Sequence, residues 1–166
     1  MAKKPKPSLA TPTDLKSNSA MSVADALNGI LADSFALYFK TKNFHWHVSG
    51  PHFRDYHLML DDQATQIFAT TDVIAERVRK TGNTTLRSIG DISRHQSIKD
   101  NDAEFVSAAD MLKELRDDNL ALVAKLREAK DIVDAAKDNA TSGILDEWTD
   151  QAEERAWFLF ETARNG

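Results

Sequence analysis

The sequence predicts an all-α protein built as a bundle of four long helices. Apolar residues recur at spacings of three and four along four stretches, and no stretch alternates as a β-strand would. Three of the four prolines lie within the first 12 residues, which leaves the rest of the chain free to form long helices. With 166 residues, of which 42% are hydrophobic and 28% charged, the chain has the composition of one soluble globular domain. No apolar run approaches the roughly 18 residues of a membrane span, so no membrane partner is expected.

The first 20 residues differ in charge from the rest of the chain. Four lysines against one carboxylate give this segment a charge of +3, so the −5 of the whole chain leaves −8 on the remainder. Because the segment has few large apolar side chains, we expect a disordered basic N-terminal tail over residues 1–20 and a bundle domain over residues 21–166. A basic start without an apolar segment is not a secretory signal, which favours a cytoplasmic location. The lysines of the tail are Lys3, Lys4, Lys6 and Lys16.

The first two helices are predicted to form an antiparallel hairpin. One apolar periodic run starts at Val23 and reaches about Val48, where Ser-Gly-Pro at positions 49–51 stops it. The next run begins near His52 and ends near Gly82, a residue type favoured just after a helix. Since the connection is short, the two helices must lie side by side.

The last two helices are predicted to form a second hairpin. Ser107, followed three residues later by a carboxylate, resembles a capping box at the start of the third helix. Charges on that helix, including Asp117 and Asp118, are expected to face solvent. The connection between the hairpins is much longer, over residues 83–102, with room for a short helix around 88–94. Two hairpins joined by one long crossover are the topology of a ferritin-like four-helix bundle.

Candidate metal ligands gather on the second helix. His57 and Asp61 are four residues apart, as are Asp72 and Glu76, and all four fall within about 100° of the helix circumference. His45 on the first helix projects toward the core. Imidazole with carboxylate suits Fe(II), Zn or Mn. The absence of cysteine excludes disulfides, Fe–S clusters and thiol catalysis.

The spacing of these ligands leaves alternatives open. His57 and Asp72 are 15 residues apart, about 22 Å along a helix, whereas a metal ion needs its ligands within about 2.6 Å. The residues are therefore either unrelated polar pairs, or the two halves of a site completed by a second, antiparallel copy of the helix. The chain has no Glu-x-x-His, so the usual di-iron centre within one ferritin-like subunit is not expected. For binding of a single ion, the sequence points to a site between subunits.

Four segments resemble the signature of the Dps family, the DNA-binding proteins from starved cells, which are also called mini-ferritins. The resemblance covers about residues 22–163, essentially the whole predicted bundle. The segments are K-N-F-H-W-H at 42–47, G-P-H-F at 50–53, H-L-M-L-D at 57–61 and D-V-I-A-E-R at 72–77.

The resemblance implies an oxidoreductase acting on metal ions, a ferroxidase. Fe(II) would bind at a two-fold interface, be oxidised preferentially by hydrogen peroxide, and be stored as Fe(III) mineral inside a shell of twelve subunits, protecting bacterial DNA from oxidative damage. Carried over by position, the ligands from one subunit are His45, His57 and Asp61, and those from its mate are Asp72 and Glu76. The family's tryptophans near the site correspond to Trp46 and Trp157.

The chain also departs from the family pattern. Position 47 is His where Asn is expected, and the start of the fourth helix lacks the acidic residue that lines the pore through which iron enters. Asp146 and Asp150, one and two turns later, are the candidates to replace it. The alternative function is a non-specific DNA-binding, nucleoid-compacting protein in which the iron site is secondary. The lysine tails would contact phosphates weakly, and many copies on one shell would supply avidity.

Overall fold

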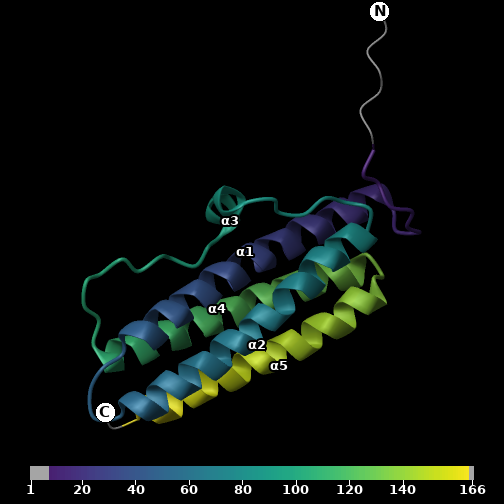
Figure 1. Cartoon of the computed structure of the whole chain (residues 1–166). Helices are drawn as coiled ribbons and strands as arrows, with labels where there is room; N and C mark the ends of the chain where they lie inside the picture. Colours follow the sequence, from purple (N-terminus) through teal and green to yellow (C-terminus); the bar gives the residue numbers. More distant parts are fainter. Residues whose placement is uncertain (1–7, 165–166) are drawn as a thin grey trace, which may run out of the picture.

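The computed structural model describes residues 8–164, which form four long helices and one short one (Figure 1). No strand occurs in this part of the chain, so the prediction of an all-α bundle with a short helix in the long crossover is confirmed. No helix of the described residues is long and apolar enough to cross a membrane. The helices are α1 (Ser17–His47), α2 (Phe53–Lys80), α3 (Ile89–His95), α4 (Ala108–Ala135) and α5 (Asn139–Ala163).

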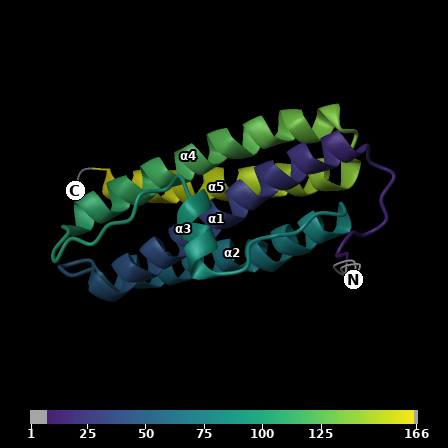
Figure 2. The same cartoon turned by 90° about the horizontal axis from the view of Figure 1, so that it is seen from above.

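The two predicted hairpins, α1 with α2 and α4 with α5, lie against each other along their length (Figure 1). The crossover runs back along the bundle, and α3 lies across α1 on its outer side (Figure 2). The start of α1 and the end of α2 therefore lie at one end of the bundle, which we call the Glu76 end. The α1–α2 turn and the end of α5 lie at the other, which we call the His57 end (Figure 1).

The core is built from the apolar stripes of the four long helices. Leu27, Leu60, Leu115 and Leu159, one from each, are completely buried. Burying a side chain of this size contributes about 1.5–3 kcal/mol. Trp148 is also buried. This shared core fixes the relative positions of α1 and α2, and hence of the candidate ligands that they carry.

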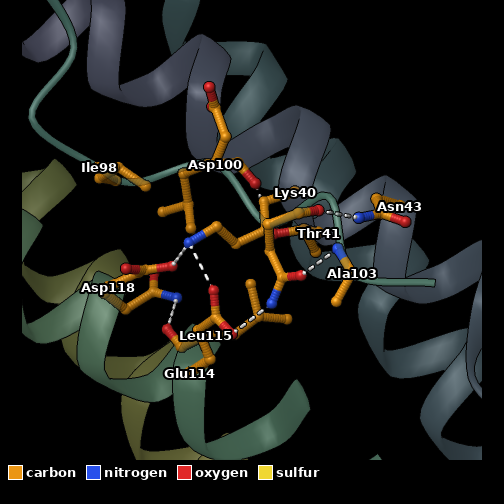
Figure 3. A network of polar contacts seen from close by, with 12 residues as sticks. Lys40, Thr41, Asn43, Ile98, Asp100, Ala103, Glu114, Leu115 and Asp118 are labelled. Atoms are coloured by element: carbon orange, nitrogen blue, oxygen red, sulfur yellow. Dashed lines mark hydrogen bonds and ion pairs between the residues drawn. The ribbon is translucent and has the colours of Figure 1, made fainter. Parts of the chain in front are cut away.

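A buried lysine ties the crossover and α4 to α1 (Figure 3). The Lys40 side chain is only 4% exposed, and its Nζ lies 2.9 Å from Glu114 Oε1 and 2.7 Å from Asp118 Oδ2. Asn101 of the crossover donates from Nδ2 to Glu114 Oε2 at 2.8 Å. Burial raises the pKa of the Asp118 carboxyl, in spite of the hydrogen bond from Lys40. The expectation that Asp118 belongs to a solvated face was therefore wrong, because its side chain is only 17% exposed and pairs with Lys40 of α1.

A second polar anchor holds the crossover farther along α1. Asp33, which is 1% exposed, accepts hydrogen bonds from the backbone N of Ser97 at 2.5 Å and from Ser97 Oγ at 2.7 Å. Lys125 of α4 donates to the same carboxylate at 2.6 Å. Because buried carboxylates must be paired, these contacts fix the path of the crossover beside α1.

The N-terminal segment is ordered by contacts with the end of α2. Helix α1 begins at Ser17, so residues 17–20, which the sequence assigned to a disordered tail, are helical. Ahead of it, Arg79 Nη2 donates to Leu9 O at 2.6 Å. Gly82 has φ +90°, and a Cβ there would lie 2.9 Å from Thr11 O, so this turn requires glycine. Of the tail lysines, Lys16 is exposed beside the start of α1, while Lys3, Lys4 and Lys6 lie outside the described residues.

Candidate metal centre

Two histidines face each other across the α1–α2 hairpin. His45 Nδ1 donates to the backbone O of His57 at 2.7 Å, and His57 Nδ1 donates to the backbone O of His45 at 2.8 Å. The rings are stacked, with centroids 3.8 Å apart. A carbonyl oxygen can only accept, so each Nδ1 carries a proton, and in the neutral form of each ring Nε2 is the atom available to a metal ion. The two hydrogen bonds fix the orientation of both rings, as backbone carbonyls do for histidine ligands in metal sites.

Asp61 completes this half of the site, one turn after His57. Its Oδ1 lies 3.9 Å from His45 Nε2, and it accepts a 2.6 Å hydrogen bond from Lys42 Nζ. The Lys42 hydrogen bond and charge hold the pKa of the Asp61 carboxyl below its ordinary value, and His45 and His57 act in the same direction. Sequence reasoning missed the role of Lys42. The signal was its position three residues before His45, on the same face of α1.

The remaining predicted ligands lie at the other end of α2. Asp72 and Glu76 are both exposed, and Glu76 has only a 3.5 Å contact with Lys80. Within residues 8–164, no group of three His, Asp or Glu side chains is arranged to hold a metal ion. The structure brings His45, His57 and Asp61 close together and leaves Asp72 about 22 Å from His57 along the helix, with Glu76 one turn farther.

Large apolar side chains are exposed between these two ends. Phe68 of α2 is 50% exposed and Leu58 is 49% exposed, on the flank that also carries the ligands. On α1, Phe39 and Trp46 are exposed and pack edge to face. Beside them runs a groove of about 950 Å³. Its apolar lining includes Phe35, Phe39, Trp46, Phe68 and Ile89. A patch of this kind usually marks an interaction surface.

The other predicted residues lie apart from the histidine pair. Trp157 is exposed on α5 and packs against Phe158. Asp146 pairs with Lys130 at 2.8 Å, whereas Asp150 is exposed. The ring of His47, the departure from the family pattern, donates from Nδ1 to Asn43 O one turn earlier.

The fold and this arrangement of ligands define a ferritin-like protein. The family model described as a ferritin-like domain matches residues 24–165. The chain is 33% identical over 145 residues to a DNA protection during starvation protein from Brevibacillus brevis, covering 87% of this chain and 97% of the relative. It is 33% identical over 149 residues to a protein of the same name from Agrobacterium fabrum (strain C58), covering 90% of this chain and 92% of that one. The crystal structure of a Dps protein from Bacillus brevis matches with a TM-score of 0.85 and 32% identity, over 89% of this chain and 99% of that chain. The chain therefore belongs to the Dps family.

Proposed function

We propose that the protein is a ferroxidase that binds Fe(II) between two antiparallel copies of α2, oxidises it, and stores the Fe(III) as mineral inside a shell. Hydrogen peroxide is the preferred oxidant in this proposal, and removal of Fe(II) and peroxide protects DNA. The relatives named above are DNA protection during starvation proteins, which fits this role. The observation that carries the proposal is the division of the ligands, with three held at one end of α2 and two left exposed at the other.

An antiparallel partner helix brings the two halves together. In an isologous dimer, each residue near one end of α2 meets residues near the other end of the partner helix. His57 and Asp61 of one subunit then face Asp72 and Glu76 of its mate, and the dyad passes near Phe68. The exposed apolar side chains around Phe68 and the groove beside it would be covered by the second copy. Two sites form per dimer, and neither exists in a single chain.

The ligand set matches the chemistry of iron oxidation. The imidazole Nε2 atoms of His45 and His57 bind Fe(II), whereas the carboxylates of Asp61, Asp72 and Glu76 favour the harder Fe(III). The protein thereby favours loss of an electron from the bound substrate ion. Two Fe(II) ions supply two electrons, which with two protons reduce one hydrogen peroxide to two water molecules as its O–O bond breaks. The His45–His57 backbone hydrogen bonds hold both rings in place throughout.

The assembly and iron route belong to the same proposal. A dodecamer built from two-fold dimers encloses the mineral, and Asp146 and Asp150, about two and three turns into α5, are the candidates to line the route of iron into it. The Lys130 ion pair neutralises Asp146 within one subunit, so Asp150 is the better candidate. The protein would act in the cytoplasm of a bacterial cell, in association with the nucleoid.

Non-specific DNA binding is the alternative function. Lys16 is exposed at the Glu76 end, where the segment that leads to Lys3, Lys4 and Lys6 also lies. A few lysines per subunit neutralise few phosphates, so binding depends on multiple copies and weakens steeply with salt. Removal of residues 2–16 should abolish a gel shift at low salt if the tail binds DNA. An unchanged shift would contradict this function.

Variation of the histidine half of the site tests the ferroxidase. The double variant His57→Ala, Asp61→Ala should oxidise Fe(II) far more slowly while still assembling into a shell. Anaerobic Fe(II) loading followed by peroxide, with Fe(III) absorbance and size-exclusion chromatography as readouts, measures chemistry and assembly together. Wild-type oxidation rates in this variant would refute the site.

A further inference from the structure

A second groove, of about 440 Å³, opens between α2 and α5. It lies on the side of α2 roughly opposite His57 and Asp61, since its α2 residues are offset from them by more than about 90° around the helix. Polar side chains bridge the two helices here. Gln63 Nε2 donates to Arg155 O at 3.4 Å, and Gln66 Nε2 lies 3.5 Å from Glu154 Oε2.

Arg155 is among the residues that line this groove, although it is only 4% exposed. Its Nε donates to Asn119 Oδ1 and its Nη1 to Gln66 Oε1, both at 2.7 Å. Both acceptors are neutral amides, and no carboxylate of residues 8–164 lies within ion-pair distance of this side chain. An arginine has five N–H donors, and the other three have no protein partner in the described chain.

A buried cation without a counter-charge is costly unless an anion joins it. Burial lowers the pKa of the Arg155 guanidinium to about 10, although the charge of Glu154, which lies outside ion-pair distance, acts in the opposite direction. On its inner side, Arg155 borders a cavity of only about 10 Å³ beside Gln151. That space holds a single water molecule at most. An anion larger than water can therefore reach the guanidinium only through the groove between α2 and α5.

We propose that this groove binds inorganic phosphate, with the guanidinium of Arg155 as the group that holds its oxygens. The exposed carboxylates of Asp55, Asp62 and Glu154 also line the groove and attract cations. Phosphate therefore binds most tightly together with an iron ion, which the carboxylates hold. This iron-dependent part rests on the proposed function, because Fe(III) is the product of the proposed oxidation. The groove then retains phosphate together with stored iron.

Gln66→Glu gives the sharpest test. This substitution keeps the shape of the side chain and places a carboxylate on Arg155, so the guanidinium gains an internal counter-ion. Phosphate binding to the iron-free shell, measured by equilibrium dialysis, should weaken by about tenfold or more. The new carboxylate gains a contact with Arg155 but also faces Glu154, so the melting temperature is measured beside binding to separate lost binding from lost folding. Arg155→Ala is less suitable because it leaves Asn119 and Gln66 without their donor.

Thr162→Glu is the matched control, because it adds the same charge to the same groove about two turns away from Arg155. It should retain most of the phosphate binding. After addition of Fe(II) and peroxide, wild-type protein should take up more phosphate than without iron, and Gln66→Glu should not. No phosphate uptake by wild type under either condition, equal binding in Gln66→Glu, or an equal loss in both variants would overturn the proposal. Phosphate binding without any Fe(II) oxidation would support this site and contradict the ferroxidase.

Discussion

The two ends of α2 carry two halves of one proposed site, and the chain prepares them differently. At the His57 end, the imidazoles are fixed by reciprocal backbone hydrogen bonds and Asp61 is paired with Lys42. At the Glu76 end, Asp72 and Glu76 are exposed and loosely held. Ordering imidazoles requires the packing of two helices, whereas exposed carboxylates are well solvated until a metal ion arrives. One half of the site is therefore preorganised within the subunit, and the other half depends on assembly.

The scaffold under the two ends also differs. At the His57 end, one buried cation, Lys40, joins α1 to two carboxylates of α4 (Figure 3). At the Glu76 end, Arg77 of α2 donates to Asp138 Oδ1 at 2.9 Å, and Asp138 also caps the start of α5. Substitution of Lys40 or Asp138 can therefore destabilise the packing at one end of the bundle while every candidate ligand is kept.

Complementation between subunits should give the largest effect. Subunits with His57→Ala, Asp61→Ala and subunits with Asp72→Asn, Glu76→Gln should each oxidise Fe(II) about 100-fold more slowly than wild type. When the two are unfolded together and reassembled, heterodimers regain one intact site, and about a quarter of all sites should recover. The measurement is the rate of Fe(III) absorbance. A mixture no faster than either variant alone would show that the two ends do not share a site.

Lys40→Met should lower the free energy of unfolding by about 3 kcal/mol. The substitution leaves the carboxylates of Glu114 and Asp118 at the His57 end without their cation. Burial raises the pKa of Asp118, so the folded state binds this proton more tightly than the unfolded state. The loss of unfolding free energy in Lys40→Met should therefore be largest at neutral pH. It should shrink as the pH falls toward the ordinary pKa of aspartate. Urea unfolding at two pH values measures it. Adding Asp118→Asn should restore part of the loss, and no restoration would contradict this account.

Asp138→Asn should destabilise the Glu76 end by about 1 kcal/mol at pH 7, since Asn can still cap α5 but loses the charge that pairs with Arg77. Burial pushes the pKa of Asp138 upward, but hydrogen bonds from Thr141 and the charge of Arg77 outweigh it, so the net shift is downward. The stabilisation is therefore present above the ordinary value of 3.8 and is lost as the pH falls below it. Thermal unfolding from pH 7 to below 4 checks this. A stability difference between wild type and Asp138→Asn that grows as the pH falls would contradict this account.

Lys42→Met should have the smallest effect, a tightening of Fe(II) binding by at most about fivefold, because Lys42 competes with iron for Asp61 Oδ1. The Lys42–Asp61 ion pair contributes little free energy because water screens it, since the Asp61 side chain is 48% exposed. Anaerobic Fe(II) titration of the assembled protein measures the change. Lys80→Met, beside Glu76, is the control and should change affinity less, since its contact is longer and more exposed. Weaker Fe(II) binding in Lys42→Met would mean that Lys42 positions Asp61.

The sequence alone determined the helices and singled out the candidate ligands. Helical periodicity, the Ser107 cap and the Gly82 stop are local signals. Helix α2 begins and ends, and helix α4 begins, close to the predicted positions. The spacing of four within each ligand pair is also local, because residues four apart share a helix face wherever the helix packs. The 15-residue gap between His57 and Asp72 is sufficient to predict that one chain cannot complete the site.

Only the tertiary structure decided which charges are covered and what touches them. Asp118 and Arg155 lie on helices rich in charge, so sequence pattern could not distinguish them from solvated neighbours, yet both are covered where another helix or the crossover packs over them. The Lys42–Asp61 pair and the crossed His45–His57 hydrogen bonds join residues of different helices. Their distances depend on how α1 and α2 pack, which is set by the shared core and not by the spacing of residues along either helix.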